Sequence, residues 1–194
     1  MLPTTSTYLA TKILERKVLT TGKEFKLNSG ELSSFYYDFG KFSDSLGLVE
    51  LGFSYYRAII EFKINFDIII GVAYKGIIPA LATCNYFFIY SQDTHFKNIP
   101  YTILRKETKD HGEGGNIIGS DISDKRVLLL DDVYTTGKAI SRAIIEIEKY
   151  NPKSISILVA LNRNINGNEE DLIKINNCSI YSITSHKTVL SLMK

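Results

Sequence analysis

The segment Arg126–Ala139, RVLLLDDVYTTGKA, constrains this chain more than any other, because an apolar run ends there on two adjacent acids and a small, hydroxyl-rich turn. Val127–Leu130 lacks polar alternation, which is typical of a central strand covered on both faces of a parallel sheet. From Gly137 the apolar spacing becomes helical, with isoleucines recurring on one face. The segment therefore predicts a strand, a loop at the carboxyl end of that strand and the start of a helix.

A loop in this position is suited to bind a ligand. Open α/β sheets bind ligands at the carboxyl ends of their strands, and the free N–H groups at a helix start favour an anion. Thr135, Thr136 and Gly137 therefore predict a phosphate cradle. Asp131 and Asp132 disfavour phosphate and need another partner, which is a sugar diol, a metal ion or metal-bound waters. Phosphate beside hydroxyls suggests a ribose phosphate, whereas an acidic turn plus a helix cap explains only some of these features.

The two acids and the T-T-G turn resemble the phosphoribosyl pyrophosphate (PRPP) signature of the type I phosphoribosyltransferases. The turn is not a P-loop, because Asp132 and Ala139 occupy positions that require Gly and Ser/Thr. The segment Arg105–Asn116, RKETKDHGEGGN, narrows the resemblance to orotate phosphoribosyltransferases, and related segments extend from about Val18 to Arg163. The resemblance implies a glycosyltransferase (pentosyltransferase) of pyrimidine (UMP) biosynthesis that converts orotate and PRPP to orotidine 5′-monophosphate and pyrophosphate.

Composition agrees with one domain of this kind. A chain of 194 residues with 44% hydrophobic content buries one substantial core, and alternating strand and helix patterns predict an α/β fold over residues 1–194. The resemblance implies the type I phosphoribosyltransferase fold, a central, mainly parallel sheet flanked by helices. It also implies a small hood from about 18–42 and 164–194, the second including the strand-like Cys178–Thr184, and a flexible lid over 105–119.

Charge and cysteine content favour a cytoplasmic protein without nucleic-acid or membrane partners. The formal net charge of +2 is too small to indicate nucleic-acid binding. Cys84 and Cys178 lack metal-ligand spacing and suggest reduced thiols. The N-terminal MLPTTSTYLATKIL lacks the basic region and apolar core of a signal peptide. The most apolar region, Phe66–Ala82, is interrupted by a lysine, a glycine and a proline, so we expect no membrane span.

A second loop suited to an anion is Ala73–Gly76, AYKG, which follows the buried strand pattern Phe66–Val72. Its backbone N–H groups lie near a helix start and Lys75 supplies one cation, although a solvated lysine in a turn explains the same pattern. In the resembling family this loop, here with Tyr74 and Lys75, cups the pyrophosphate of PRPP. The family also implies a non-proline cis peptide bond within the loop.

The resemblance assigns roles to the central segment. Asp131 and Asp132 are expected to hold the ribose hydroxyls and metal-bound waters and to stabilise positive charge on the ribosyl group. The cofactor is Mg²⁺, held by PRPP and waters near the two acids without a direct protein ligand. Thr135 is expected to face orotate as well, and Lys138 stands where a small or hydroxyl side chain is usual. The PRPP contacts expected here are Asp131, Asp132, Val133, Tyr134, Thr135, Thr136, Gly137, Lys138 and Ala139.

Orotate contacts are expected from two distant segments. Tyr36 and Tyr37, in FKLNSGELSSFYYDFGKF, match an aromatic pair that holds the pyrimidine largely through backbone groups, although core packing is the alternative. Arg163 follows a buried strand and matches the arginine that contacts orotate; its guanidinium suits a carboxylate, and a surface arginine is the alternative. Asn28 stands where the family places a PRPP lysine. Lys26, two positions earlier on the same strand face, is our hypothesis for that contact.

The expected lid combines cations with a glycine-rich run, which indicates a mobile loop. An isolated loop of this kind is usually solvated surface, but closure over pyrophosphate would deliver cations and exclude water. Arg105 and Lys106 point to opposite faces if they lie in a strand. The family resolves this with a homodimer whose sites are shared: Arg105, Lys109 and His111 reach the partner's PRPP and Lys106 its own, with Lys109 neutralising the leaving group.

Two other functions compete with this interpretation. A purine phosphoribosyltransferase shares the PRPP loops but lacks the carboxylate-matched Arg163 and the RKETKDHGEGGN segment. A regulator that keeps a PRPP pocket and binds nucleic acid is disfavoured by the small net charge and the retained cations of the lid.

Overall fold

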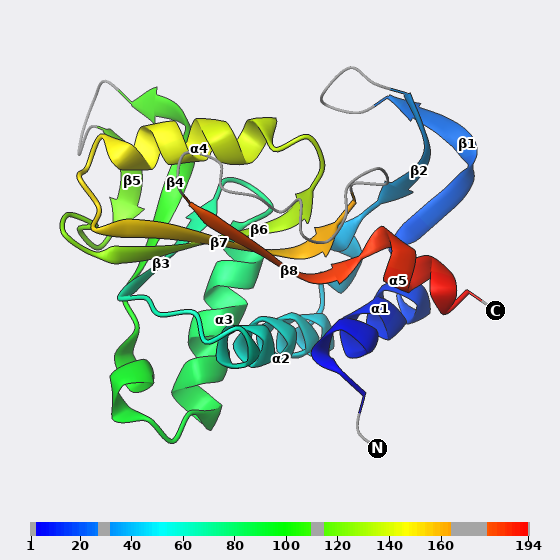
Figure 1. Ribbon diagram of the computed structural model, residues 1–194, viewed down its shortest axis with the longest axis horizontal. Coiled ribbons are helices and arrows are strands. Elements are labelled where there is room, and N and C mark those ends of the chain that lie inside the picture. The colour runs from blue at the N-terminus through cyan, green and yellow to red at the C-terminus, as the bar shows by residue number, and fades with distance from the viewer. Residues whose placement is uncertain (1–2, 27–31, 110–114, 164–177, 194) are drawn as a thin grey trace.

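The computed structural model describes residues 3–26, 32–109, 115–163 and 178–193 (Figure 1). Within these ranges the main sheet has six strands in the order β5-β4-β3-β6-β7-β8, and β5 is its antiparallel member. The strands are β3 (Ile68–Val72), β4 (Tyr101–Lys109), β5 (Gly115–Gly119), β6 (Arg126–Tyr134), β7 (Ser154–Asn162) and β8 (Ser179–Ser185). The expected mainly parallel sheet is therefore confirmed.

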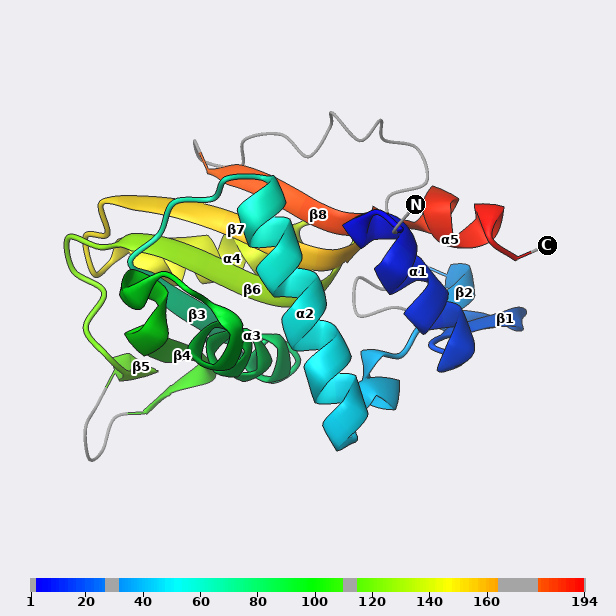
Figure 2. The ribbon, with the colours of Figure 1, turned by 90° about the horizontal axis from the view of Figure 1, so that it is seen from below.

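Helices cover both faces of this sheet because its central strands are apolar on both faces. Alternate residues of one strand enter different cores: Leu128 and Leu130 face one cluster, whereas Leu129 faces the other. In Figure 1, α4 (Lys138–Glu148) lies above the sheet, and α1 (Thr5–Glu15), α2 (Ser45–Glu61) and α3 (Ile77–Tyr90) lie below it. Figure 2 shows α2 and α3 crossing the lower face. None of the described helices is long and apolar enough to cross a membrane.

Strand β6 is longer than its sequence pattern predicts. We expected a loop to begin at the two acids, but the strand continues to Tyr134. Asp131 pairs with Val159 and Tyr134 pairs with Asn162 on β7. The prediction was wrong because the apolar run marks only the doubly covered part of the strand, whereas backbone pairing continues beyond it. The acids are therefore held by the sheet.

The hood consists, in the described residues, of the antiparallel pair β1 (Leu19–Lys26) and β2 (Leu32–Tyr37), which stands away from the main sheet in Figure 1. Our assignment of the whole C-terminal segment to the hood was wrong for Ser179–Ser185. This segment is β8, which pairs in parallel with β7 and forms the edge of the main sheet. Among the described C-terminal residues, α5 (His186–Ser191) packs against α1 and contacts the hood through the hydrogen bond between His186 and Tyr37.

The expected lid also contains more regular structure than its glycines suggest. Residues 105–109 continue β4, and Gly115–Gly119 forms the antiparallel partner β5. An antiparallel partner satisfies the backbone hydrogen bonds of both segments, which compensates for the low strand propensity of glycine. The prediction of a loop over the whole of 105–119 was therefore wrong. Residues 110–114, including His111, lie outside the described residues.

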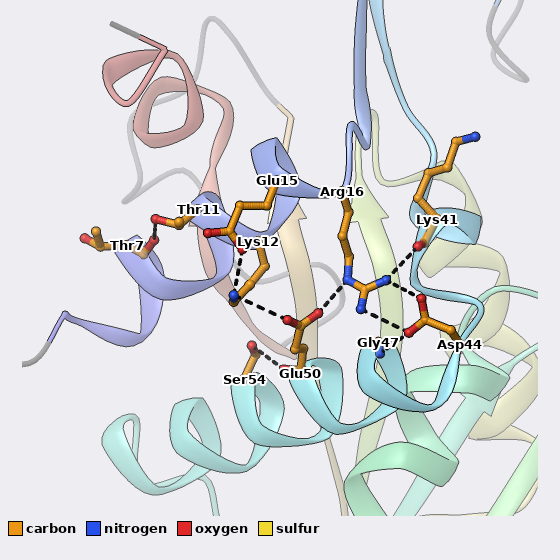
Figure 3. Close-up of polar contacts among 10 residues, drawn as sticks. All are labelled: Thr7, Thr11, Lys12, Glu15, Arg16, Lys41, Asp44, Gly47, Glu50 and Ser54. Atoms are coloured by element: carbon orange, nitrogen blue, oxygen red, sulfur yellow. Dashed lines mark hydrogen bonds and ion pairs between the residues drawn. The ribbon is translucent and has the colours of Figure 1, made fainter.

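A network of charged residues joins α1 to α2 and to the short helix η1 (Phe39–Phe42) (Figure 3). Arg16 lies at its centre: its Nε donates to Glu50 Oε2 at 2.5 Å, and its two Nη atoms donate to Asp44 at 2.8 and 3.0 Å. Nη1 also donates to the Lys41 carbonyl oxygen at 3.1 Å. The Glu50 side chain is 7% exposed, and its second partner, Lys12, is 3.4 Å away. This network fixes η1, which lines the site described below.

Arg16→Ala should lower the free energy of unfolding by about 3 kcal/mol, because it leaves the buried Glu50 carboxylate without its shortest ion pair. Urea unfolding of the two proteins measures the difference. Glu15→Ala is the matched control, since the Lys12–Glu15 pair is at the surface and Glu15 is 55% exposed; we expect a loss below about 1 kcal/mol there. Equal losses in the two variants would contradict a special role for the buried pair.

Candidate active site

The two loops that the sequence predicted as anion sites meet at one edge of the sheet. Strands β3 and β6 are neighbours, with Gly71 opposite Leu130, so the loop after β3 lies beside the acids of β6. Lys75 Nζ is 3.5 Å from Asp132 Oδ2. The peptide bond between Ala73 and Tyr74 is cis, which confirms the expected non-proline cis bond, and the Tyr74 side chain is exposed.

Close packing of this loop against β6 depends on Gly76. A Cβ atom there would lie 2.4 Å from the Leu130 carbonyl oxygen and 2.6 Å from the Val72 nitrogen. Both contacts are to backbone, which cannot move without disturbing the two strands. Glycine at this position therefore lets Lys75 approach Asp132.

Asp132 is buried and Asp131 is partly buried, which is unusual for carboxylates. Asp131 Oδ1 accepts from the Asp132 N–H at 3.0 Å, and Asp132 Oδ1 accepts from the Val133 N–H at 2.8 Å. Among the described residues, Asp132 Oδ2 has no hydrogen-bond partner and only the ion pair with Lys75. Burial and then the charge of Asp132 raise the pKa of Asp131. Burial also raises the pKa of Asp132, although Lys75 opposes this shift.

The electrostatics of the pair favour an added positive charge or hydroxyl donors. Burial alone would lower the pKa of Lys75, but Asp132 and then Tyr36 raise it, so this ammonium stays charged. One ammonium shared with two carboxylates leaves negative charge at the site. The donor set therefore fits Mg²⁺ with its bound waters, or the diol of a ribose, as the sequence predicted.

Tyr55 supports the acid pair and was not predicted from the sequence. It lies in α2 with no exposed surface, and its hydroxyl donates to the Asp131 carbonyl oxygen at 2.6 Å. Burial is the largest cause of the strongly raised pKa of this phenol, and the charges of Asp132 and Asp131 add to it. The helical pattern of α2 marks Tyr55 only as a core residue. Nothing in the sequence connects it with β6.

The segment predicted to form a phosphate cradle lies at the start of α4. Gly137 caps the helix with φ of +76°, in the left-handed region that favours glycine, and no side chain caps its first N–H groups. Thr135, Thr136, Lys138 and Ala139 surround this end and are exposed. The N–H groups therefore face an open site and can bind an anion. Val133 and Tyr134 belong to the end of β6 and are partly buried.

A cavity of about 90 Å³ lies beside Lys75 and Asp132. One wall comes from η1 and the residue before it, which lie in the segment predicted to form the hood but were not among the predicted contacts. The Asp38 carboxylate accepts from the Gly40 N–H at 3.1 Å, a local turn of the kind that the spacing of Asp and Gly favours. The lining residues are Asp38, Phe39, Gly40, Leu51, Tyr55, Lys75, Ile78, Pro79 and Asp132.

The two tyrosines predicted to bind orotate have different surroundings. Tyr36 lies toward the site: its hydroxyl accepts from Lys75 Nζ at 3.3 Å, and its ring stacks on Phe25. Tyr37 is 2% exposed, and a hydrogen bond of 2.7 Å joins its hydroxyl to His186 Nδ1. Adjacent residues of β2 point to opposite faces, so only Tyr36 places its side chain near Lys75.

Arg163 is positioned at the sheet edge and beneath the hood. Its N–H donates to the Tyr134 carbonyl oxygen at 2.9 Å, which ties it to the end of β6. Its Nη2 donates to Ser33 Oγ at 2.6 Å, and its Cζ lies 4.7 Å from the centroid of the Phe35 ring. The backbone of Arg163 is therefore fixed at the end of β6, and its guanidinium is held against the hood.

The remaining predicted residues lie on the outer strands. Arg105 is partly buried, with a buried Nη1 that has no hydrogen-bond partner among the described residues, whereas Lys106 is exposed. This difference in exposure is what side chains on opposite faces of a strand would give. The backbone of Lys109 ends β4, while its side chain and His111 lie outside the described residues. Lys26 ends β1 and is exposed, and Asn28 also lies outside the described residues.

Comparison with known proteins gives the family of the chain. Residues 50–187 match the phosphoribosyl transferase domain family. The chain is 42% identical over 153 residues to an orotate phosphoribosyltransferase of Buchnera aphidicola, covering 79% of this chain and 70% of the relative. It is 41% identical over 157 residues to that of Stutzerimonas stutzeri, covering 81% and 70%.

Solved structures with the same fold include an orotate phosphoribosyltransferase and a UMP synthase. The crystal structure of an orotate phosphoribosyltransferase from Francisella tularensis superposes with a TM-score of 0.72 at 27% identity, covering 92% of this chain and 85% of the other. A UMP synthase from Leishmania donovani gives a TM-score of 0.76 at 23% identity over 96% of this chain and 37% of the other, a likeness of fold alone. The match to the family and the identity to these relatives show that the chain belongs to the orotate phosphoribosyltransferases, a family of the phosphoribosyl transferase domain proteins.

Proposed function

We propose that this protein transfers the 5-phosphoribosyl group of PRPP to orotate, giving orotidine 5′-monophosphate and pyrophosphate. The observation that carries the proposal is the meeting of Lys75, the buried acid pair and the open start of α4 at one sheet edge, with Arg163 under the hood beside them. Phosphate, ribose and a carboxylate each find a suitable partner there. Relatives named orotate phosphoribosyltransferase support orotate as the base.

The reaction is a substitution at the anomeric carbon of PRPP. The bond from this carbon to the pyrophosphate oxygen breaks, and pyrophosphate carries away its electron pair. A ring nitrogen of orotate forms the new bond and loses its proton to the departing pyrophosphate or to solvent. No enzyme nucleophile is needed. Asp131 and Asp132 accept hydrogen bonds from the ribose hydroxyls and stabilise the positive charge that develops on the sugar. The N–H groups at the start of α4 bind the 5′-phosphate, and Lys75 with the Ala73–Gly76 backbone binds pyrophosphate.

Mg²⁺ fits this site because, within the described part of the chain, Asp132 Oδ2 is buried without a hydrogen bond and Lys75 is the ammonium that pairs with Asp132. Asp131 and Asp132 would hold it through its bound waters, and the bound ion would offset the charge of the leaving pyrophosphate. The residues of this chain then align the sugar between the 5′-phosphate cradle and Lys75.

We further propose a homodimer with shared sites and a cytoplasmic location. The opposite directions of Arg105 and Lys106 support the sharing, because one of them faces away from any single pocket. Two cysteines without metal or disulfide spacing support the cytoplasm. Residues 1–194 form one domain in this proposal, with β1 and β2 as its hood and the β4–β5 hairpin as its lid.

An ultraviolet assay with purified protein, PRPP and Mg²⁺ tests the function directly. We expect turnover with orotate and none with adenine, guanine or hypoxanthine. Turnover of a purine instead of orotate would assign the protein to the other branch of the family. A gel shift with and without PRPP examines the regulatory alternative, for which we expect no nucleic-acid binding.

Arg163→Ala should weaken the binding of orotate and leave the binding of PRPP unchanged. Loss of hydrogen bonds to a charged group costs roughly 1.5–3 kcal/mol, so the Michaelis constant for orotate should rise about tenfold to a hundredfold. Steady-state kinetics with each substrate varied measures the two constants separately. A normal orotate constant beside a damaged PRPP constant would reverse the assignment.

The matched control for this variant is Ser33→Ala. It removes the hydroxyl that accepts from Arg163 Nη2 but leaves the guanidinium and the Phe35 ring in place. We expect a smaller rise in the orotate constant, about fivefold or less, because the variant removes one support of the guanidinium, worth about 1 kcal/mol or less, and leaves the guanidinium itself to bind the carboxylate. An equal effect of the two variants would mean that Arg163 serves the hood and not the substrate.

A further inference from the structure

The carboxyl ends of β7 and β8 bring Arg163 and His186 to the same sheet edge. The two strands are parallel, and Asn162 pairs with Ser185, so each residue directly follows a paired position. The hood lies against this edge through β2. Alternation along β2 places Ser33, Phe35 and Tyr37 on one face, and all three contact Arg163 or His186.

His186 is fixed from two sides by this face of the hood. It is 8% exposed, and its ring stacks on Phe35 with centroids 4.0 Å apart and an interplanar angle of 12°. Its Nδ1 shares the 2.7 Å hydrogen bond with the Tyr37 hydroxyl. Burial, and then the charge of Arg163, lower the pKa of His186, so the imidazole is neutral at pH 7. Burial raises the pKa of Tyr37, although Arg163 opposes this, so the phenol is neutral as well.

The Phe35 ring contacts both Arg163 and His186. The Arg163 guanidinium carbon lies 4.7 Å from its centroid, a cation–π distance, and His186 is stacked on the same side chain. Phe35 is 6% exposed, so few other orientations are open to it. The orientation of the Phe35 ring therefore depends on the stacked His186. The surface against which the Arg163 guanidinium packs depends in turn on that orientation.

Packing of the hood against the sheet edge would not by itself require an imidazole and a phenol at these positions. Burying an imidazole and a phenol costs free energy unless each is hydrogen-bonded, and an apolar pair of similar size fills a core without that cost. A satisfied polar pair instead specifies one orientation of the packed elements. The hydrogen bond between Tyr37 and His186 thus fixes how β2 sits on the end of β8, and with it the position of Phe35 under Arg163.

We propose that His186 is a positioning residue for orotate recognition, which holds the Arg163 guanidinium through the Phe35 ring and the Tyr37 hydroxyl. This proposal rests on the assignment of Arg163 to orotate given above. His186 does not touch the substrate in this arrangement. Its contribution is to keep one orientation of the guanidinium available before orotate binds, which lowers the cost of ordering it on binding.

Four variants separate positioning from packing. His186→Ala removes the stack and the hydrogen bond, and His186→Phe keeps a flat ring on Phe35 but loses the hydrogen bond. Tyr37→Phe removes the same bond from the other side. Lys187→Ala, at the next and exposed position, is the control. Steady-state constants for orotate and PRPP and the thermal midpoint are measured for each.

The expected pattern is selective for orotate. His186→Ala should raise the Michaelis constant for orotate about tenfold and that for PRPP less than about twofold. His186→Phe and Tyr37→Phe should each raise the orotate constant about threefold. The two together should match either alone, because they break one hydrogen bond. Equal rises for both substrates, or no rise at all, would overturn the proposal.

A second measurement keeps this proposal separate from the proposed function. In protein labelled with ¹⁵N-arginine, the Nε–H signal of Arg163 is identified by its loss in Arg163→Lys. Because the guanidinium lies on an aromatic ring, His186→Ala should shift this signal and Lys187→Ala should leave it in place. An unmoved signal would overturn the positioning role even if the wild-type protein converts orotate. If His186→Ala shifts the signal but the wild-type protein does not convert orotate, the positioning role stands and the assignment of orotate as the substrate is refuted.

Discussion

Lys109→Ala and the double variant Asp131→Asn, Asp132→Asn should be nearly inactive as separate proteins and regain activity when their subunits exchange. Lys109→Ala alone should lower turnover by about 10²–10³-fold, as expected for a charge donor to the leaving group. The double variant should fail because it removes the carboxylates that hold the ribose and the metal-bound waters. In a shared site the lid and the acids come from different chains, so a mixed dimer contains one intact site.

The position of β4 is what motivates this arrangement. Its last position paired with β3 is Leu104, and the strand continues beyond it to Lys109 in a hairpin with β5. In Figures 1 and 2 this hairpin lies at the opposite end of the view from β1 and β2 of the same chain. The end of β4 thus lies away from the hood that covers Arg163, as the proposed shared site requires.

Random pairing fixes the expected level of recovery. Roughly half of the dimers are mixed and each has one good site of two, so activity should approach about one quarter of the wild-type value. Mass spectrometry of differently labelled subunits establishes that exchange occurred. The two variants kept apart under the same conditions are the control. If exchange is complete and activity stays at the background, the lid serves its own chain and the shared site is wrong.

Asp131→Asn should abolish most of the activity and yet make the protein more stable at neutral pH. Turnover should fall about 10²–10³-fold, because an amide cannot stabilise the positive charge on the ribosyl group in the same way. The amide retains an oxygen that can accept from the Asp132 N–H, so the local backbone contact survives. Removing a charge that the buried site disfavours should then raise the free energy of unfolding by about 1–3 kcal/mol at pH 8.

The expected gain in stability follows from the direction in which folding shifts the pKa of Asp131. Burial and Asp132 raise the pKa of Asp131 to about 7, above its value in the unfolded chain of about 4. The folded state therefore binds more protons between these values, and the wild-type protein loses stability as the pH rises from about 4 to about 7. Asparagine does not titrate. The advantage of the variant should be absent near pH 4, grow up to about pH 7 and then stay constant.

Asp67→Asn is the matched control with the opposite sign. Hydrogen bonds from Arg126 lower the pKa of Asp67 to about 2, through contacts at 2.5, 2.8 and 3.0 Å. Its stabilisation is present above about pH 4 and is lost as the pH falls to about 2, so this variant should be less stable than the wild type at pH 8. Chemical unfolding from pH 4 to 8 compares the three proteins. A loss of stability in both variants would contradict the electrostatic account of the acid pair.

Local patterns in the sequence were sufficient for the features that depend on neighbouring residues. The apolar run of β6, the T-T-G turn and the helical spacing of α4 lie within one segment, and the structure has them in that order. The Ala73–Gly76 loop follows the same logic, since a strand and a helix start frame it. Strand alternation also predicted the opposite directions of Arg105 and Lys106. In each case the spacing of apolar residues along the chain determines which face of the element is buried. This spacing can be read from the sequence without knowing which element packs against it.

Contacts between distant segments were decided by the tertiary structure alone. Arg163 is hydrogen-bonded to Ser33, 130 residues away in the sequence, and Tyr37 to His186, 149 residues away. The sequence pattern around each of these residues does not indicate which residue it will contact. The same holds for β8, whose weak strand pattern suits the hood as well as the sheet edge that it occupies. Alternation tells which face of a strand is buried but not which strand pairs with it or in what register. That choice is made when the whole core packs, because only then are the competing pairings compared in free energy.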